Sequence, residues 1–168
     1  LFAALAPHVE ASRVQRYEAA AARFAAALER DGMFLASGAC GVGWPETRTP
    51  HDSLASRTPY LVSTALAGVE LQAWLYARTR NERYRQRALA ALDYTLSQLR
   101  ADGSLPVMGG GPAAEGAYVA AAYVQEGWMA ADMFLRDDAV RGTLRQALKK
   151  HLGFLTGDAL PELQYEFT

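Results

Sequence analysis

The sequence has few cysteines and histidines, no strong excess of charge, and no apolar run long enough to span a bilayer. The single cysteine, Cys40, cannot form a disulfide within the chain, so the cysteine count does not identify the compartment. The histidines, His8, His51 and His151, are scattered and form no metal-binding motif. Seventeen basic and eighteen acidic residues, without a basic cluster, argue against nucleic acid as a ligand. We therefore predict no metal, no cofactor, no nucleic-acid partner and no membrane partner.

Apolar residues are abundant. They make up 51% of the 168 residues, which fits one soluble domain, 1–168, with a sizeable core. The chain begins with Leu1 rather than Met, and no signal-peptide pattern is visible. We therefore expect the chain to be a fragment of a longer protein, with a cytoplasmic location favoured over a periplasmic one.

Hydrophobic periodicity predicts an all-α chain built from two alternating kinds of helix. The helices at about 60–77 and 115–135 are almost uncharged and apolar on every side, as in helices that are buried all round. The helices at about 9–30, 81–100 and 139–155 are charged, and each has one apolar face. In the first of them this face is formed by Val14, Tyr17, Ala21, Phe24, Ala25 and Leu28. We therefore expect an antiparallel array of helical hairpins with alternating inner and outer helices. A weak repeat of about 58 residues supports this arrangement.

The predicted connections differ greatly in length. The links after the inner helices, at 79–80 and 137–138, are very short, which requires antiparallel neighbours. The connections into the inner helices, at 31–59 and 102–114, are long, and each begins at an Asp-Gly pair that ends the preceding helix. Because consecutive helices alternate in direction, both long loops are expected at one end of the array. Loops of this length inside a compact domain are usually either functional or disordered.

The alternating helices, the segment YARTRNERYRQRALAALDYTLSQLRADGSLP and the loop DGSLPVMGGGPAAEGAY resemble the α/α-toroid proteins. Within that group the chain is most similar to the six-hairpin glycosidase superfamily, which includes unsaturated glucuronyl hydrolases and N-acylglucosamine epimerase-like proteins. The resemblance covers about residues 13–155. It implies an incomplete or partial (α/α) toroid, because a full ring holds more helices than are predicted here. It also implies a small-molecule carbohydrate ligand, bound where the inner helices begin.

That end of the array gathers polar and aromatic residues suited to a sugar. Helix N-termini offer unpaired N–H groups, and aromatic side chains offer flat apolar faces. The residues expected to act as catalytic acid/base groups are Glu115, Asp52 and His51. The residues expected to bind substrate are Trp44, Arg57, Tyr60, Tyr118 and Glu126.

Several of these residues have a structural interpretation as well. Asp52 beside His51 is a candidate acid/base pair, but aspartate is also a common turn or capping residue. Trp44 is either a stacking platform or a plug that fixes its loop to the core. Arg57 either holds an anionic substrate group or pairs with a neighbouring carboxylate. Glu115 is either a general acid or a residue that stabilises the start of a helix.

Ionisable residues within the inner helices are informative because such groups must be paired or face a cavity. The polar residues of this kind are Glu70, Gln125, Glu126 and Asp132. The large apolar residues of these helices are most simply assigned to the core: Trp74, Tyr76, Trp128 and Met133. Cys40 is a candidate nucleophile, but no histidine lies at a fixed spacing from it.

Two classes of function remain open from the sequence. One is a carbohydrate-active hydrolase, lyase or epimerase that acts on an anionic or N-acetylated sugar by carboxylate acid/base chemistry. The other is a non-catalytic helical scaffold that docks a protein partner. We also expect a large apolar surface on the first or last helix, covered by a second copy or by a missing remainder of the same chain.

Overall fold

The computed structural model describes residues 10–41, 60–106 and 117–156, with backbone only for residues 117–120. The described residues are mostly helical and contain no strand, so the all-α prediction is confirmed. The helices outside the centre of the fold are α2 (Ala11–Arg30), α5 (Glu82–Ser97), α6 (Ala117–Leu135) and α7 (Asp138–Phe154). These bounds lie close to the predicted ones. Closure into a toroid, whole or partial, stays a prediction.

One further helix occupies the centre of the fold and is named here the central helix. Its three consecutive segments are α3 (Leu61–Ser63), η4 (Thr64–Glu70) and α4 (Leu71–Thr79). The η4 segment is π-helical, with the wider i to i+5 pattern of hydrogen bonds, as in the bond from the Leu71 N–H to the Leu66 carbonyl. The side-chain amide of Gln72 donates to the Ala67 carbonyl at 3.3 Å. The Gln72 side chain thus provides a hydrogen-bond donor for the Ala67 carbonyl, which lies within η4.

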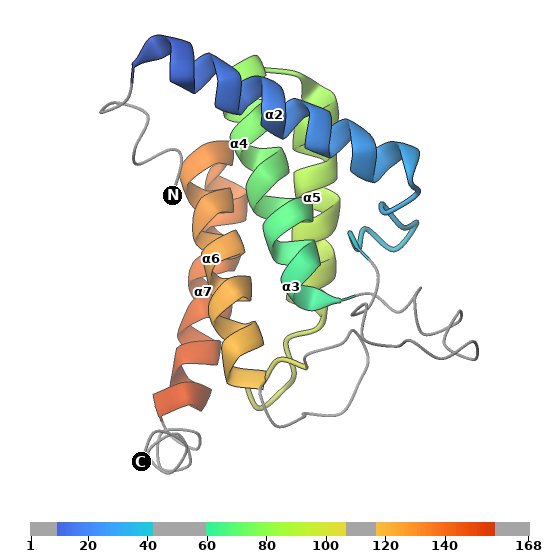
Figure 1. Cartoon of the computed structure of the whole chain (residues 1–168). Coiled ribbons are helices and arrows are strands. Elements are labelled where there is room, and N and C mark those ends of the chain that lie inside the picture. The colour runs from blue at the N-terminus through green and yellow to red at the C-terminus, as the bar shows by residue number, and fades with distance from the viewer. Residues whose placement is uncertain (1–9, 42–59, 107–116, 157–168) are drawn as a thin grey trace, which may run out of the picture.

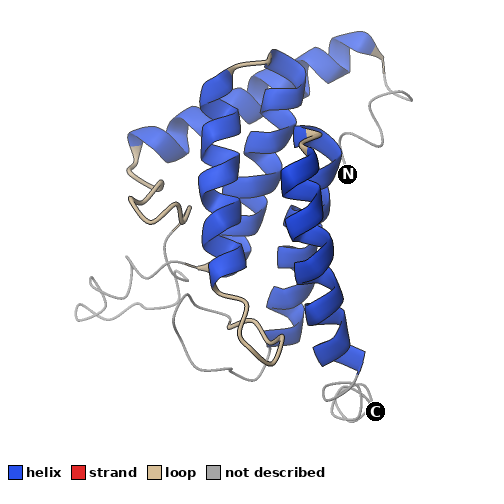
Figure 2. Cartoon of the chain, turned by 180° about the vertical axis from the view of Figure 1, so that it is seen from behind, coloured by secondary structure: helices blue, strands red, loops and turns tan. Residues whose placement is uncertain are grey.

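The central helix and α6 lie side by side and start at the same end of the molecule (Figure 1). From behind, α5 and α7 lie over them and run in the opposite direction (Figure 2). Helix α2 crosses the other end of the central helix obliquely and packs mainly on α4 (Figure 1). Its Glu29 pairs with Arg87 of α5 at 2.6 Å. Its Glu18 pairs with Arg78 of α4.

The two short links have the same backbone geometry. Arg80 and Arg136 both have a positive φ, 56° and 53°, and so end the central helix and α6 in the left-handed conformation. The next residues cap the following helices: the Asn81 side chain accepts from the Arg83 N–H, and the Asp137 side chain from Ala139 and Val140. The predicted Asp-Gly helix ends are also present, with Gly32 and Gly103 at φ of 68° and 94°. Local sequence therefore determines where these helices stop.

Small residues allow the central helix to approach α5 and α6 closely. A Cβ atom on Gly127 of α6 would lie 2.8 Å from the Ala65 carbonyl oxygen of the central helix. A Cβ atom on Gly68 would lie 2.7 Å from the Ala91 Cβ of α5 and 2.9 Å from the Cys40 Cβ. Both distances are too short for a real side chain. Glycine at these two positions therefore brings η4 against both of its neighbours.

The core includes one buried polar contact between helices. Trp128 of α6 is fully buried, and its indole N–H donates to the Thr95 hydroxyl of α5 at 2.9 Å. Around it pack buried apolar residues of every helix after α2, among them Leu61, Val69, Leu92, Val124 and Leu144. The sequence assignment of Trp128 to the core is correct.

The assignment of Met133 to the core is wrong, and so is the expectation that α6 is buried on all sides. Met133 is 57% exposed, Met129 is 60% exposed and Tyr123 is 40% exposed. With the exposed Glu126 between Tyr123 and Met129, these residues follow one another at steps of three to four positions along one face, which no described helix covers. The exposed face of α6 could not be recognised from composition, because both faces of the helix carry apolar residues.

His151, near the end of α7, is buried without its full set of hydrogen bonds. Its Nδ1–H donates to the Gly103 carbonyl at 2.7 Å, whereas its Nε2 is buried without a partner among the described residues. Phe154 stacks on the ring, and the edge of Trp128 is close. Burial lowers the pKa of His151, and the Gly103 contact opposes this shift only in part. The neutral imidazole is therefore the form that the fold accommodates.

The close approach at Gly127 predicts that Gly127→Ala lowers the free energy of unfolding by roughly 1–3 kcal/mol, because the added methyl would overlap Ala65. The matched control is Gly142→Ala in α7, where an added Cβ meets nothing within 4 Å. That change should leave stability unchanged or raise it by up to about 1 kcal/mol, from helix propensity alone. Denaturant unfolding measures both. Equal effects of the two variants would contradict the packing argument.

The burial of His151 predicts a stability that depends on pH. Because its pKa is lower in the folded protein, the unfolded chain binds more protons, and stability falls as the pH drops below the ordinary histidine value of about 6.5. His151→Gln keeps a donor for Gly103 but cannot be protonated. Its unfolding free energy should change less between about pH 7 and pH 5. Hydrogen bonds lower the pKa values of Asp102 and Asp137, so these two groups make stability depend on pH only at more acidic pH. Identical profiles for the variant and the parent protein would exclude the role of His151.

Candidate functional groove

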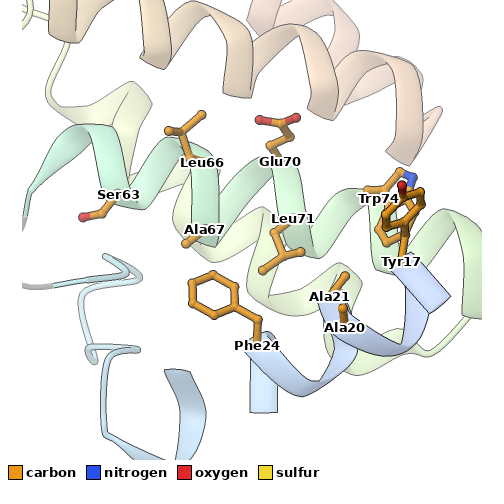
Figure 3. A pocket seen from close by; sticks show the side chains of 10 residues that line it. All are labelled: Tyr17, Ala20, Ala21, Phe24, Ser63, Leu66, Ala67, Glu70, Leu71 and Trp74. Atoms are coloured by element: carbon orange, nitrogen blue, oxygen red, sulfur yellow. The ribbon is translucent and has the colours of Figure 1, made fainter. Parts of the chain in front are cut away.

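A groove with a volume of about 600 Å³ lies between α2 and the central helix. Its size is typical of ligand-binding pockets, and its lining is almost entirely apolar. Figure 3 shows the lining side chains from both helices. The lining residues of α2 are Tyr17, Ala20, Ala21 and Phe24, and those of the central helix are Ser63, Leu66, Ala67, Glu70, Leu71 and Trp74.

The wall formed by α2 is an apolar stripe that the fold leaves partly uncovered. Tyr17 and Phe24 are 44% and 54% exposed, although they lie on the predicted apolar face of this helix. Ala25 on the same face is buried. Helix α2 therefore buries a small side chain against the bundle and leaves two large aromatic ones at the groove.

Among the described lining residues Glu70 is the one carboxylate, and a second carboxylate, Glu126, lies nearby on α6. In Figure 3 the Glu70 side chain points from the central helix toward α6. Its pKa is raised, first by burial and second by the negative charge of Glu126. Two of the three inner-helix carboxylates singled out in the sequence, Glu70 and Glu126, are thus neighbours. Among the described residues, neither forms an ion pair with a basic side chain.

Tyr60 lies directly before the central helix and is half-buried. Burial raises the pKa of Tyr60, and the neighbouring phenol of Tyr123 on α6 adds to the shift. Tyr123 is one turn before Glu126 on α6. The described part of the predicted sugar site therefore has Tyr60 and Glu126 along the seam between the central helix and α6.

The other predicted site residues are those of the long loops and Tyr118. Trp44, His51, Asp52, Arg57 and Glu115 lie outside the described residues. Tyr118 lies in the first turn of α6, where only the backbone is described. The predicted approach of the two long loops therefore stays a prediction. The start of the central helix, the end of α5 and the start of α6 lie toward one end of the molecule, whereas α2 crosses the other end (Figure 1).

The groove residues Tyr17, Phe24 and Trp74 were not among the predicted site residues. Periodicity placed Tyr17 and Phe24 on the inward face of a helix, and composition placed Trp74 in the core. Only the crossing direction of α2 uncovers this face, and no local pattern in the sequence specifies that direction. Glu70 did carry a signal, as the single charge in the predicted helix at 60–77.

The segment around Cys40 is bound to the start of the central helix. The Cys40 N–H donates to the Thr64 hydroxyl at 3.1 Å, and the Ser63 hydroxyl donates to the Cys40 carbonyl at 3.1 Å. Phe34 and Cys40 form an isolated antiparallel bridge. Burial raises the pKa of the Cys40 thiol to about 12, although the positive charge of Arg87 opposes the shift. A thiol with this pKa is a poor nucleophile, so Cys40 is a packing residue.

The described chain is thus an all-α bundle with an open apolar groove. Comparisons with models of protein families, with curated proteins and with solved structures each give no match. The likeness to six-hairpin glycosidases therefore rests on the sequence features alone. In the described ranges, no group of three potential metal-binding side chains occurs. None of the helices described is both long and apolar enough to cross a bilayer.

The burial of Cys40 predicts slow alkylation by iodoacetamide in the native protein. Since the thiolate is the reactive form, the rate at neutral pH should be at least about a hundredfold below that of the same chain in denaturant. Mass spectrometry of the modified protein over time measures both rates. Rapid native alkylation would show that Cys40 is accessible and would reopen the nucleophile hypothesis.

Proposed function

We propose that this chain is a helical binding module that docks an α-helical segment of a protein partner in the groove between α2 and the central helix. The observation that carries the proposal is the apolar groove of about 600 Å³ with two uncovered aromatic side chains, Tyr17 and Phe24. Large exposed apolar side chains gathered in a concave site are typical of interaction sites.

The shape of the groove favours a helix as the ligand. Both walls are helices, whose backbone N–H and C=O groups are bonded internally, so the described part of the groove offers no free strand edge to an extended peptide. Tyr17 and Phe24 are two turns apart, about 10 Å along the axis of α2. This spacing matches the i and i+7 anchors that an amphipathic helix places into a groove.

The apolar lining also favours a protein segment over a sugar. A sugar ring needs several hydrogen-bond partners, whereas the described lining offers mainly the Glu70 carboxylate and the Tyr17 and Ser63 hydroxyls. The Ser63 hydroxyl already donates within the chain, to the carbonyls of Cys40 and Tyr60.

A carbohydrate-active enzyme is the second candidate function. The observation that favours it is the neighbouring pair Glu70 and Glu126, because a carboxyl group with a raised pKa beside a second carboxylate is the arrangement of glycosidase acids. The aromatic side chains of Tyr17, Phe24 and Trp74 would then supply stacking faces. The predicted loop residues Glu115, Asp52 and His51 would complete the site.

The binding-module proposal predicts that Phe24→Ala weakens the binding of amphipathic helical peptides by at least about fivefold, since truncating an aromatic anchor costs more than about 1 kcal/mol. The probes are fluorescent Leu-rich peptides of about 18 residues, long enough to form a helix. Anisotropy titration measures the affinities. Stability should change by less than about 0.5 kcal/mol, because the ring is exposed.

The matched control is Leu152→Ala on α7, an exposed apolar residue outside the groove. It should bind the peptides like the parent protein. Equal losses in both variants would mean non-specific adsorption and would overturn the assignment to the groove. Binding of uronic or N-acetylated sugars by calorimetry, with no peptide binding, would favour the carbohydrate candidate instead.

A further inference from the structure

The exposed face of α6 adjoins the groove. Its large apolar side chains are Tyr123, Met129 and Met133, named here the α6 stripe. Glu126 lies within the stripe, one turn from Tyr123 and one turn from Met129, and it is exposed. On the neighbouring central helix, Leu66 and Glu70 of the groove point toward α6 (Figure 3). Two uncovered apolar surfaces therefore meet at a pair of carboxylates.

The other carboxylates of this region are already paired within the chain. Asp132, the next acidic residue of α6, lies 2.8 Å from the Arg141 guanidinium. Glu18, on the α2 side of the groove, is bound by Arg78. Glu70 and Glu126 differ from these two, because no described cation pairs with either. Among the described residues, the junction is thus the place on this face where two carboxylates have no basic side chain paired with them.

We propose that the groove and the α6 stripe form one docking surface for a basic amphipathic helix, which places a lysine or arginine between Glu70 and Glu126 and apolar side chains on both sides. This inference rests on the proposed function and specifies its partner. The charge of the surface argues against an acidic or neutral helix, because either would bury two like charges without compensation.

The electrostatics of the junction agree with this assignment. Burial and the proximity of Glu126 raise the pKa of Glu70, so the empty surface carries a repulsive interaction. A cation between the two carboxylates would add two attractions that offset this repulsion. The methionines of the stripe add adaptability, because their unbranched side chains fit partners of different shape.

The test uses one peptide framework with a single variable position. The probe is an amphipathic Leu/Ala/Gln helix of about 18 residues with Lys at the centre of its apolar face, and two companions carry Gln or Glu there. The parent protein should bind the Lys peptide at least about fivefold more tightly than the Gln peptide, and the Glu peptide most weakly. The preference should shrink as salt is raised.

Variants of the two carboxylates then test whether Glu70 and Glu126 cause the preference for the Lys peptide. The double variant Glu70→Gln/Glu126→Gln should bind the Lys and Gln peptides equally. Asp93→Asn, the matched control, removes an exposed carboxylate from α5, which does not line the groove, and should keep the full preference. If the double variant does not fold, Glu126→Gln alone, at an exposed position, should reduce the preference by at least about twofold.

Met129→Ser should weaken all three peptides about equally, because it removes an apolar contact and no charge. Equal affinity of the parent protein for the Lys and Gln peptides would overturn the basic-partner inference while leaving the proposed function intact. Absence of binding by every peptide would overturn both. Self-association of the protein through this face, abolished by Met129→Ser and accompanied by no peptide binding, would also overturn both.

Discussion

The fold depends on how closely the central helix approaches its neighbours. Gly127 lets α6 contact the backbone at Ala65, and Gly68 lets the central helix rest against α5 and Cys40. These contacts fall within η4, the π-helical segment, and the Cys40 segment is held to the same turn by Thr64. Trp128, which follows Gly127 directly, donates to the Thr95 hydroxyl of α5. One narrow region therefore fixes the positions of three helices and a loop segment.

Local features of the sequence were sufficient to predict most of the helices. Asp-Gly pairs and short polar links marked the helix ends, because capping and left-handed residues act over a few neighbouring positions. The burial of each helix was less predictable. Helix α6 has apolar residues on both faces, and whether Met129 and Met133 are covered depends on what packs beside them. The periodicity of one helix does not show whether another helix covers its apolar face.

The candidate site was only partly accessible to sequence reasoning. Glu70 and Glu126 stood out as charges in apolar helices, and the structure places them near each other. The groove itself was missed because it depends on the oblique crossing of α2, whose contacts, such as that of Glu18 with Arg78, join residues distant in the sequence. The chemistry predicted for Trp44, His51, Asp52, Arg57 and Glu115 concerns residues outside the described ranges.

The equivalent links at Arg80 and Arg136 have a consequence for folding. Each joins two consecutive helices through two residues, with a left-handed residue followed by a capping side chain. Both helix pairs can therefore form from contacts that are local in the chain, which is the fast step in helical proteins. The bond between Trp128 and Thr95 connects one pair to the other. Burial of that indole thus reports the later step, in which two preformed helix pairs dock.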